Sequence, residues 1–271
     1  MLPLTTQNVH TGNLILVNAY HGILDKPKDF LVPACDRFPE ILLQRCAATL
    51  LNELMQEIDG WSFIVPVSGY RSPEEQQRIW DDSLRDNGEE FTRKYVAVPG
   101  HSEHQTGLAI DLGLKAEHID FIRPDFPYSS ICQTFREKAP KYGFILRYPA
   151  GKEKKTGIGH EPWHFRYVGT PHAQVMTEAD LTLEEYMEFI RQFPYGGRPY
   201  LTQSGSRQVR ISYFPAKAGT DFSGKPLEDP DRDDAGVSPE SLPQILSADF
   251  PCTVSGNNID GFILTEYICR S

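Results

Sequence analysis

The spacing of hydrophobic residues predicts a chain that alternates between helices and short strands. Between residues 39 and 58 the apolar side chains recur at helical spacing, and the pair Asp59-Gly60 is typical of a helix end. A short β-type run follows at residues 61–67. Another helix is expected over residues 129–142, where Gly143 closes the pattern.

Two further helices carry recognisable start signals. Ser72 is a favourable N-cap, with proline at the next position and Glu75 in the capping-box position, and this helix is expected to end near Arg85. Thr182 and Glu185 repeat the capping-box spacing before another apolar run. The sequence therefore predicts a helix after each of these N-caps.

Short apolar or alternating runs predict strands between the helices. Residues 14–17 are interpreted as a first strand, and residues 107–113 and 163–168 alternate. In the last run the aromatic side chains share one face and are expected to pack in the core, while His164 and Arg166 share the other. Helices mixed with a few short strands indicate an α+β domain, in which helices flank a small antiparallel sheet.

A change of pattern near residues 193–199, which are rich in proline and glycine, suggests a domain boundary. We expect a catalytic domain over residues 1–197 and a small α/β accessory domain of unknown role over residues 198–271. In the second part a short helix could open at Ser238, and the last strands resemble a hairpin with Asp260-Gly261 in its turn.

Composition and charge narrow the class of protein. The 271 residues are 39% hydrophobic and 24% charged, which suits a soluble globular protein with a real core. The formal net charge of −10 argues against a nucleic-acid partner, for which a basic stripe is expected. No apolar run approaches the roughly 20 residues of a membrane span.

The cysteines and the N-terminal sequence bear on the compartment. The five cysteines are dispersed without a CxxC pair, which argues against a disulfide scaffold and favours a reducing compartment. The first residues lack the basic start and apolar core of a secretory signal. We therefore expect a cytoplasmic protein; the alternative is an extracellular protein with a membrane anchor ahead of the given sequence.

Two segments, residues 100–111 and 159–164, are dense in groups that can bind a metal. Catalytic zinc is commonly held by three protein ligands, which leaves a fourth position for water. Two histidines and an aspartate from these segments would supply the ligands, and a remaining carboxylate could accept the proton of that water. Isolated histidines elsewhere are expected to be solvated residues without a chemical role: His10, His21, His118 and His172.

Residues 160–164 also match the helical zinc motif H-E-x-x-H. That motif requires a helix, because only there do the two histidines share one face. Pro162 inside the motif is incompatible with a helix interior, and the aromatic residues that follow favour a strand. We therefore reject the helical motif. His160 loses its role as an obligatory ligand, while Glu161 and His164 keep their separate roles, one on a turn and the other on a strand.

Three motifs together resemble the zinc D,D-peptidases of the VanY and VanXY type, within the larger group that includes lysostaphin-like enzymes and hedgehog domains. They are SGYRSPEEQ at residues 68–76, SEHQTGLAID at 102–111 and EPWH at 161–164. The resemblance is close over about residues 60 to 170. It implies one Zn²⁺ per chain, carried by the small antiparallel sheet and held by His104, Asp111 and His164.

The same resemblance implies roles for four more residues. Glu161 would be the general base, and Arg71 would stabilise the oxyanion. Ser102 and Gln76 would help to bind the substrate. An arginine suits this role on chemical grounds as well, since it stays charged and offers donors in a fixed geometry.

The resemblance implies hydrolysis of the D-Ala-D-Ala peptide bond, in the free dipeptide or in peptidoglycan precursors, as in vancomycin resistance. An alternative enzyme is a phage-lysin-like endopeptidase that cuts a cross-link within the cell wall. An alternative of another class is a non-catalytic zinc-bearing binding module. The presence of both Glu161 and Arg71 favours an enzyme.

Overall fold

The computed structural model describes residues 6–24, 31–216 and 251–268, which form two compact units. One unit is Val17–Tyr186, and the other joins Met1–Leu16 to Met187–Ser271. The expected boundary after residue 197 therefore differs from the division in the structure. The reason is that Phe193 contacts Tyr200 edge to face, and the Tyr195 N–H donates to the Tyr213 carbonyl, so the proline- and glycine-rich stretch belongs to the second unit.

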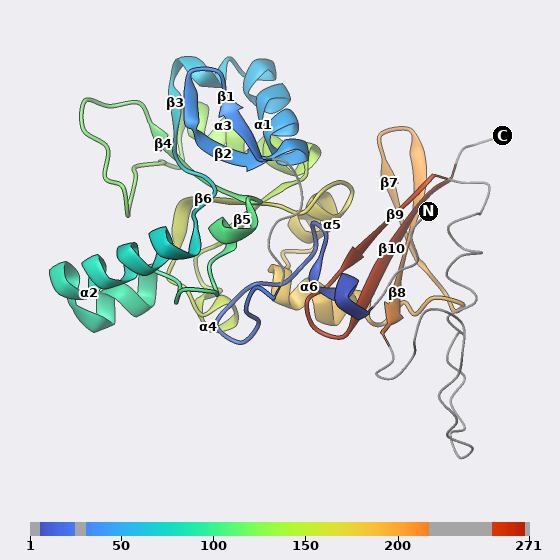
Figure 1. Ribbon diagram of the computed structural model, residues 1–271. Helices are drawn as coiled ribbons and strands as arrows, with labels where there is room; N and C mark the ends of the chain where they lie inside the picture. The colour runs from blue at the N-terminus through green and yellow to red at the C-terminus, as the bar shows by residue number, and fades with distance from the viewer. Residues whose placement is uncertain (1–5, 25–30, 217–250, 269–271) are drawn as a thin grey trace. The chain divides into compact units, whose positions relative to one another are not determined.

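A four-stranded antiparallel sheet forms the centre of the larger unit (Figure 1). Its strands are β3 (Ile64–Ser68), β4 (Ala109–Leu114), β6 (Glu161–Tyr167) and β5 (Phe144–Tyr148), in this order across the sheet. The predicted small antiparallel sheet with flanking helices is confirmed, and so is the α+β class.

The predicted helix over residues 39–58 is wrong in its first part. Strand β1 (Leu31–Cys35) pairs with β2 (Phe38–Gln44), and only then does α1 (Arg45–Glu57) begin. The apolar residues near the start of the run fit either period, and the long-range pairing with β1 selects the strand.

The signals that open the other helices are confirmed. In α2 (Pro73–Tyr95) the Ser72 hydroxyl accepts the Glu75 N–H at 3.1 Å. The helix does not end near residue 85: Gly88, with φ of 81°, interrupts it, and helical structure then resumes. Before α6 (Leu183–Ile190), the Thr182 N–H donates to Glu185 Oε2 and the Glu185 N–H to Thr182 Oγ1, which completes the predicted capping box.

The remaining helices of this unit are short. The expected helix over 129–142 is present as α3 (Ser130–Lys138) followed by the 3-10 turn η4 (Ala139–Tyr142). Two other α-helices are α4 (Glu153–Thr156) and α5 (His172–Glu178). The 3-10 turns η2 (Gly60–Ser62) and η3 (Glu103–Thr106) precede β3 and β4.

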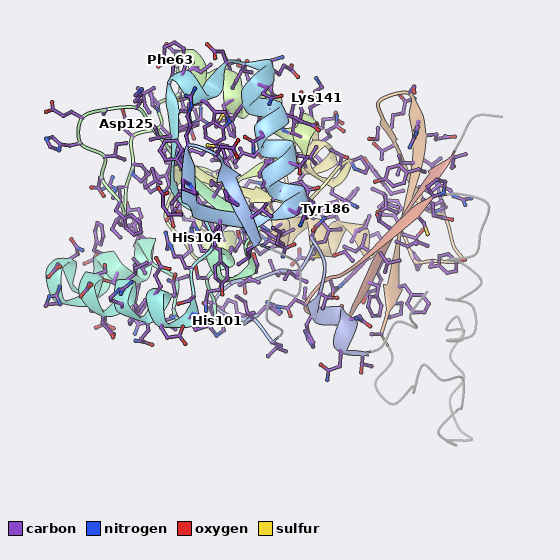
Figure 2. All side chains as sticks on the ribbon, turned by 45° about the horizontal axis from the view of Figure 1, so that its top comes forward. Phe63, His101, His104, Asp125, Lys141 and Tyr186 are labelled. Carbon is purple, nitrogen blue, oxygen red and sulfur yellow. The ribbon has the colours of Figure 1, made fainter. Side chains whose placement is uncertain are left out.

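One face of the sheet carries the hydrophobic core. Leu108, just before β4, and buried side chains of β4 and β6 pack there with residues of α1 and α3: Ile110, Leu112, Trp163, Phe165, Tyr167, Leu51, Leu54, Cys132 and Phe135. This confirms the predicted packing of the aromatic residues. Because neighbouring residues of a strand point to opposite faces, the other face is left to Asp111, His164 and Arg166. In Figure 2, His104 lies among the side chains of this unit, whereas Phe63, Asp125 and Lys141 lie at its surface.

The second unit contains another antiparallel sheet, with strands β7 (Tyr200–Ser204), β8 (Arg207–Pro215), β10 (Gly261–Ile268) and β9 (Cys252–Gly256) in this order. The predicted hairpin is confirmed as β9–β10, and the Asn257 side chain accepts backbone N–H groups in its turn. The helix expected at Ser238 lies outside the described residues.

The N-terminal residues of this unit pack on the hairpin. Val9 of η1 (Thr6–His10) shares a core cluster with Phe214 and Phe262. The predicted strand at residues 14–17 is wrong: these residues are buried but join no described sheet. Instead, the Leu14 N–H donates to the Ser255 hydroxyl.

Two further findings concern membrane spans and cysteines. Within the described ranges no helix is long and apolar enough to span a bilayer. Cys35, Cys132 and Cys252 are free thiols, and Cys269 lies outside those ranges.

His172 is buried rather than solvated, contrary to expectation. Its Nδ1 lies 2.7 Å from the Tyr186 hydroxyl, and burial lowers the pKa of His172 to about 3. The imidazole therefore stays neutral in the folded chain under mildly acidic conditions. In the unfolded chain its pKa is about 6.5, so the unfolded state gains a proton that the folded state does not.

We predict that His172 makes folding sensitive to mild acid. As pH falls from about 6.5 towards 3, it should reduce the free energy of unfolding by up to about 1.4 kcal/mol per pH unit. His172→Asn keeps an acceptor near the Nδ1 position, so it should flatten this slope. Urea unfolding of the metal-free protein at several pH values measures it; equal slopes in both proteins would contradict the prediction.

Candidate metal centre

The register of β4 and β6 brings two predicted metal ligands together. Asp111 lies directly opposite His164 in the antiparallel pair, and both side chains point away from the hydrophobic core. His164 Nδ1 is 2.9 Å from Asp111 Oδ1. Neighbouring side chains of this kind converge only because the strand pairing fixes them on one face.

The third predicted ligand, His104, comes from η3, immediately before β4. Its Nε2 lies 3.1 Å from Asp111 Oδ2, while its Nδ1 lies 2.7 Å from the Gly69 carbonyl and donates to it. Gly107 ends the turn with φ of 70°, and a Cβ there would lie 2.7 Å from Leu31. Glycine at this position thus lets the chain turn from η3 into the sheet.

The three groups fit a zinc ion. Their ligand atoms all lie within 4.8 Å of one another, and all three residues are buried. Zinc bonds of about 2.0–2.2 Å in tetrahedral geometry place ligand atoms roughly 3.3–3.6 Å apart. Two neutral imidazoles and a carboxylate are also the donors that zinc prefers when it keeps one position open. These residues are thus the ones that could hold Zn²⁺.

The electrostatics of the three groups show how strongly the site favours positive charge. Burial alone would raise the pKa of Asp111, but His104 and His164 hold it well below its usual range. Burial lowers the pKa of His164, but Asp111 outweighs this and raises it to about 9. Without a metal, a proton on His164 therefore balances the aspartate, and metal binding must displace that proton.

Glu161 lies beside the three candidate ligands, where it could serve as a base. It opens β6, it is buried, and its Oε2 lies 3.7 Å from His164 Nδ1. Burial raises the pKa of Glu161 to about 8. A carboxylate with a raised pKa holds and releases a proton more readily near neutral pH than an exposed one does.

Arg71 is held on the other side of the aspartate. Its Nη2 lies 3.1 Å from Asp111 Oδ2, its Nε donates to the Ser68 hydroxyl at 2.8 Å, and its Nη1 donates to Gln76 Oε1 at 3.4 Å. The guanidinium also lies 5.5 Å from the ring centre of Phe121. Arg71 therefore presents a fixed positive charge at the wall of the site.

The two predicted substrate-binding residues lie in different places. Ser102 lines the cavity, and its hydroxyl has no hydrogen-bond partner among the described residues. Gln76 is fully buried and is absent from the lining; its Nε2 donates to the Ala97 carbonyl. This position suits Gln76 for holding Arg71, and direct contact of Gln76 with substrate stays a prediction.

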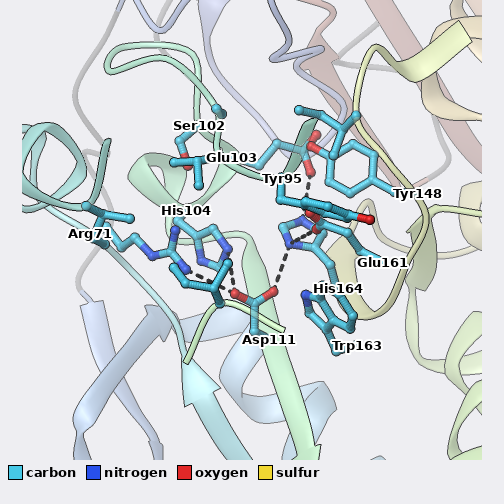
Figure 3. Close-up of a pocket in the computed structure, with 15 residues that line it drawn as sticks. Arg71, Tyr95, Ser102, Glu103, His104, Asp111, Tyr148, Glu161, Trp163 and His164 are labelled. Atoms are coloured by element: carbon cyan, nitrogen blue, oxygen red, sulfur yellow. Dashed lines mark hydrogen bonds and ion pairs between the residues drawn. The ribbon is translucent and has the colours of Figure 1, made fainter. Parts of the chain in front are cut away.

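All the candidate residues except Gln76 line one cavity of about 40 Å³ (Figure 3). One water needs roughly 10–15 Å³ by this measure, so there is room for an ion with a few waters or for a small substrate group. Apolar side chains complete the walls: Ile79, Tyr95, Val96, Ala97, Ile122, Tyr148, Ile158 and Trp163. All seven predicted site residues belong to the unit Val17–Tyr186.

His160 is separated from the ligands as expected. Residues 161–167 form a strand, which confirms the rejection of the helical motif. His160 Nδ1 lies 2.9 Å from the Tyr148 carbonyl, and its Nε2 lies 3.1 Å from the Tyr128 hydroxyl.

Two residues of the cavity were not anticipated. Glu103 lies inside the second motif and is buried with its Oε1 bound to Arg147 and Arg166. Although burial opposes it, these arginines hold the pKa of Glu103 well below its usual range. Tyr148 packs against His164, with ring centroids 4.9 Å apart. The motif position of Glu103 was the available signal, but its burial was not visible in the sequence.

Comparison with known proteins gives consistent matches. The family model VanY, described as D-alanyl-D-alanine carboxypeptidase, matches residues 40–170. The chain is 44% identical over 185 residues to VanXYC of Enterococcus gallinarum, a bifunctional D-Ala-D-Ala dipeptidase and carboxypeptidase. That alignment covers 67% of this chain and 96% of the relative.

Solved structures agree with this result. The chain matches the vancomycin resistance D,D-dipeptidase VanXYg, in complex with a D-Ala-D-Ala phosphinate analog, with a TM-score of 0.86 and 47% identity over 98% of each chain. It also resembles a mutant of the vancomycin resistance D,D-pentapeptidase VanY in complex with Zn(II), with a TM-score of 0.55 and 30% identity. This second match covers 65% of this chain and 98% of that one.

We predict that the purified protein binds about one zinc ion per chain. His104→Ala, Asp111→Ala and His164→Ala should each lose most of the metal, because each removes one of the three ligands. Metal analysis after dialysis measures the occupancy. His160→Ala is the matched control and should stay loaded; full occupancy in all three ligand variants would refute the site.

Proposed function

The chain belongs to the VanY family of D-alanyl-D-alanine carboxypeptidases, and from this premise we propose that it is a zinc-dependent peptidase that hydrolyses the D-Ala-D-Ala peptide bond. One observation carries the proposal. A three-ligand site, a buried carboxylate with a raised pKa and a fixed arginine meet in one cavity. A non-catalytic binding module would need the ligands, but neither Glu161 nor Arg71.

The candidate residues have different roles in the proposed reaction. A zinc ion held by His104, Asp111 and His164 would polarise the scissile carbonyl and make a water molecule more acidic. Glu161 accepts the proton from the attacking water, since its carboxylate faces the same cavity without being one of the three ligands. The same carboxyl group then returns the proton to the leaving amine.

Arg71 stabilises the negative charge that develops on the carbonyl oxygen of the scissile bond. As the carbonyl oxygen gains negative charge, the guanidinium can donate to it from a position that the hydrogen bonds to Ser68 and Gln76 already fix. Little reorganisation is then needed during the reaction. Such preorganised donors typically contribute about 10²–10³-fold in rate.

The substrate class follows from the relatives and from the cavity walls. VanXYC is both a D-Ala-D-Ala dipeptidase and a D-Ala-D-Ala carboxypeptidase, and VanXYg was solved with a phosphinate analogue of D-Ala-D-Ala. Small apolar groups fit beside Ile79 and Ile122, and the free hydroxyl of Ser102 can bind a polar end of the substrate. We propose D-Ala-D-Ala and peptidoglycan precursors that end in it as substrates.

A cytoplasmic location stays a prediction, which fractionation of cells would test.

Glu161→Gln should retain zinc and fold but lose activity. The amide has almost the shape of the carboxylate but cannot accept the proton, and a general base commonly contributes about 10²–10⁴-fold. Turnover of D-Ala-D-Ala and metal content are measured on the same preparation. Wild-type protein stripped by a chelator provides the metal-free control, and substantial turnover by the variant would exclude Glu161 as the base.

We expect cleavage of both D-Ala-D-Ala and a precursor peptide that ends in it, but little cleavage of D-Ala-D-lactate. The ester lacks the N–H of the scissile amide, and a buried acceptor left unpaired costs about 1–3 kcal/mol. Values of kcat/KM for the three substrates test this. Inactivity on both amides together with cleavage of an internal cell-wall cross-link would favour the lysin-like endopeptidase instead.

A further inference from the structure

Two buried polar atoms face each other next to the metal site and lack any other partner. Glu103 Oε2 and His164 Nε2 are 3.5 Å apart, and neither makes a hydrogen bond of normal length within the described part of the chain. Leaving a buried charged oxygen and a ring nitrogen unsatisfied is unfavourable. Their mutual approach therefore calls for an explanation.

The His164 ring has two distinct edges. Its Nδ1 faces Asp111 at 2.9 Å and Glu161 at 3.7 Å, so this nitrogen lies on the side of the other ligands. Its Nε2 points the opposite way, towards Glu103. Figure 3 shows Glu103 and Asp111 on opposite sides of the ring. A neutral imidazole carries one proton, and its location decides which nitrogen can bind a metal.

Glu103 cannot easily turn away from the ring. Its Oε1 accepts hydrogen bonds from Arg147 Nε at 2.8 Å and from Arg166 Nη1 at 2.9 Å, and both arginines are fully buried. Arg147 is held in turn by two hydrogen bonds to Glu184 of α6. One oxygen is thus fixed by two cations, which leaves the other directed at the histidine.

We propose that Glu103 is a positioning residue that holds the proton of His164 on Nε2 and thereby makes Nδ1 the metal-binding atom. In His104 the two ring nitrogens have the opposite roles: Nδ1 donates to the Gly69 carbonyl, which leaves Nε2 for the metal. The site would then use one nitrogen of each type. A carboxylate partner of this kind orients the ring of a metal-bound histidine and increases its basicity.

Positive charge at Nδ1, whether from a proton or from a bound cation, makes the Nε2–H a better donor to Glu103. A cation at Nδ1 therefore preserves the contact between Nε2 and Glu103 Oε2.

Glu103→Gln tests the proposal through metal affinity. The amide can keep its oxygen towards the arginines only by turning its NH₂ group to Nε2, which favours the tautomer with the proton on Nδ1. Zinc affinity, measured by competition with a chromophoric chelator, should fall about 10–100-fold. An unchanged affinity would overturn the proposal.

Glu184→Gln is the matched control. It removes a carboxylate from the same buried Arg147 but has no contact with His164. It should weaken the folded state yet leave zinc affinity within about twofold. If both variants lose affinity equally, the effect of Glu103 is only structural and the proposal fails.

The wild-type protein offers a second readout if Glu103→Gln does not fold. Nitrogen-15 NMR of the zinc-loaded chain identifies which ring nitrogen carries the proton. The proposal requires a protonated, slowly exchanging Nε2 on His164; a protonated Nδ1 would overturn it.

This inference rests on the proposed metal site, but the two can fail separately. If wild-type protein binds no zinc, the proposed function fails. If zinc binds and Nε2 of His164 proves to be the ligand atom, only the role of Glu103 is lost.

Discussion

The buried carboxylate of Asp111 is the constraint on which the site depends. An ionised carboxylate removed from water is strongly unfavourable unless positive charge lies next to it. His164 and Arg71 provide that charge, at 2.9 and 3.1 Å from a carboxylate oxygen. Burial and the neighbouring Arg71 lower the pKa of His104, whose Nε2 lies 3.1 Å from Asp111 Oδ2. The arrangement is most favourable when the site contains a proton or a cation, so the requirement for positive charge beside Asp111 suits the proposed divalent ion.

Charge compensation continues along the polar face of the sheet. Arg147 and Arg166 are fully buried, and Glu103 lies between them, with Glu184 on the far side of Arg147. Removing one partner from such a buried network typically costs about 3–5 kcal/mol, whereas the intact network contributes little net stability. Its effect is instead to fix geometry, because no member can move without leaving a buried charge unpaired. A rigid outer layer of this kind keeps ligands close to the positions that catalysis needs.

The sequence indicated the candidate ligands and the central strands better than the boundaries of helices and domains. His104, Asp111 and His164 could be proposed because few side chains bind zinc and the motifs that contain them resemble those of a zinc peptidase family. Residues 39–44 were wrongly assigned to a helix, because their apolar pattern fits one. Their pairing with β1 cannot be recognised from the local sequence. The boundary at 197 missed contacts between residues far apart in the chain, such as Val9 with Phe262. Glu103 was overlooked for a similar reason: its two arginines lie 44 and 63 residues away.

The irregular start of β6 explains how a base and a ligand three residues apart reach one cavity. In a regular strand, residues at i and i+3 point to opposite faces. Here the pairing with β5 shifts register: Leu146 pairs with Phe165, but Tyr148 pairs with Glu161, so β6 contains two more residues than β5 over this interval. Pro162, which has no N–H to donate to a ladder, lies in the extra segment. The shift allows Glu161 and His164 to line the cavity together. Pro162, which excludes a helical zinc motif, thus lies where the strand must depart from regular geometry for the base to face the metal ligands.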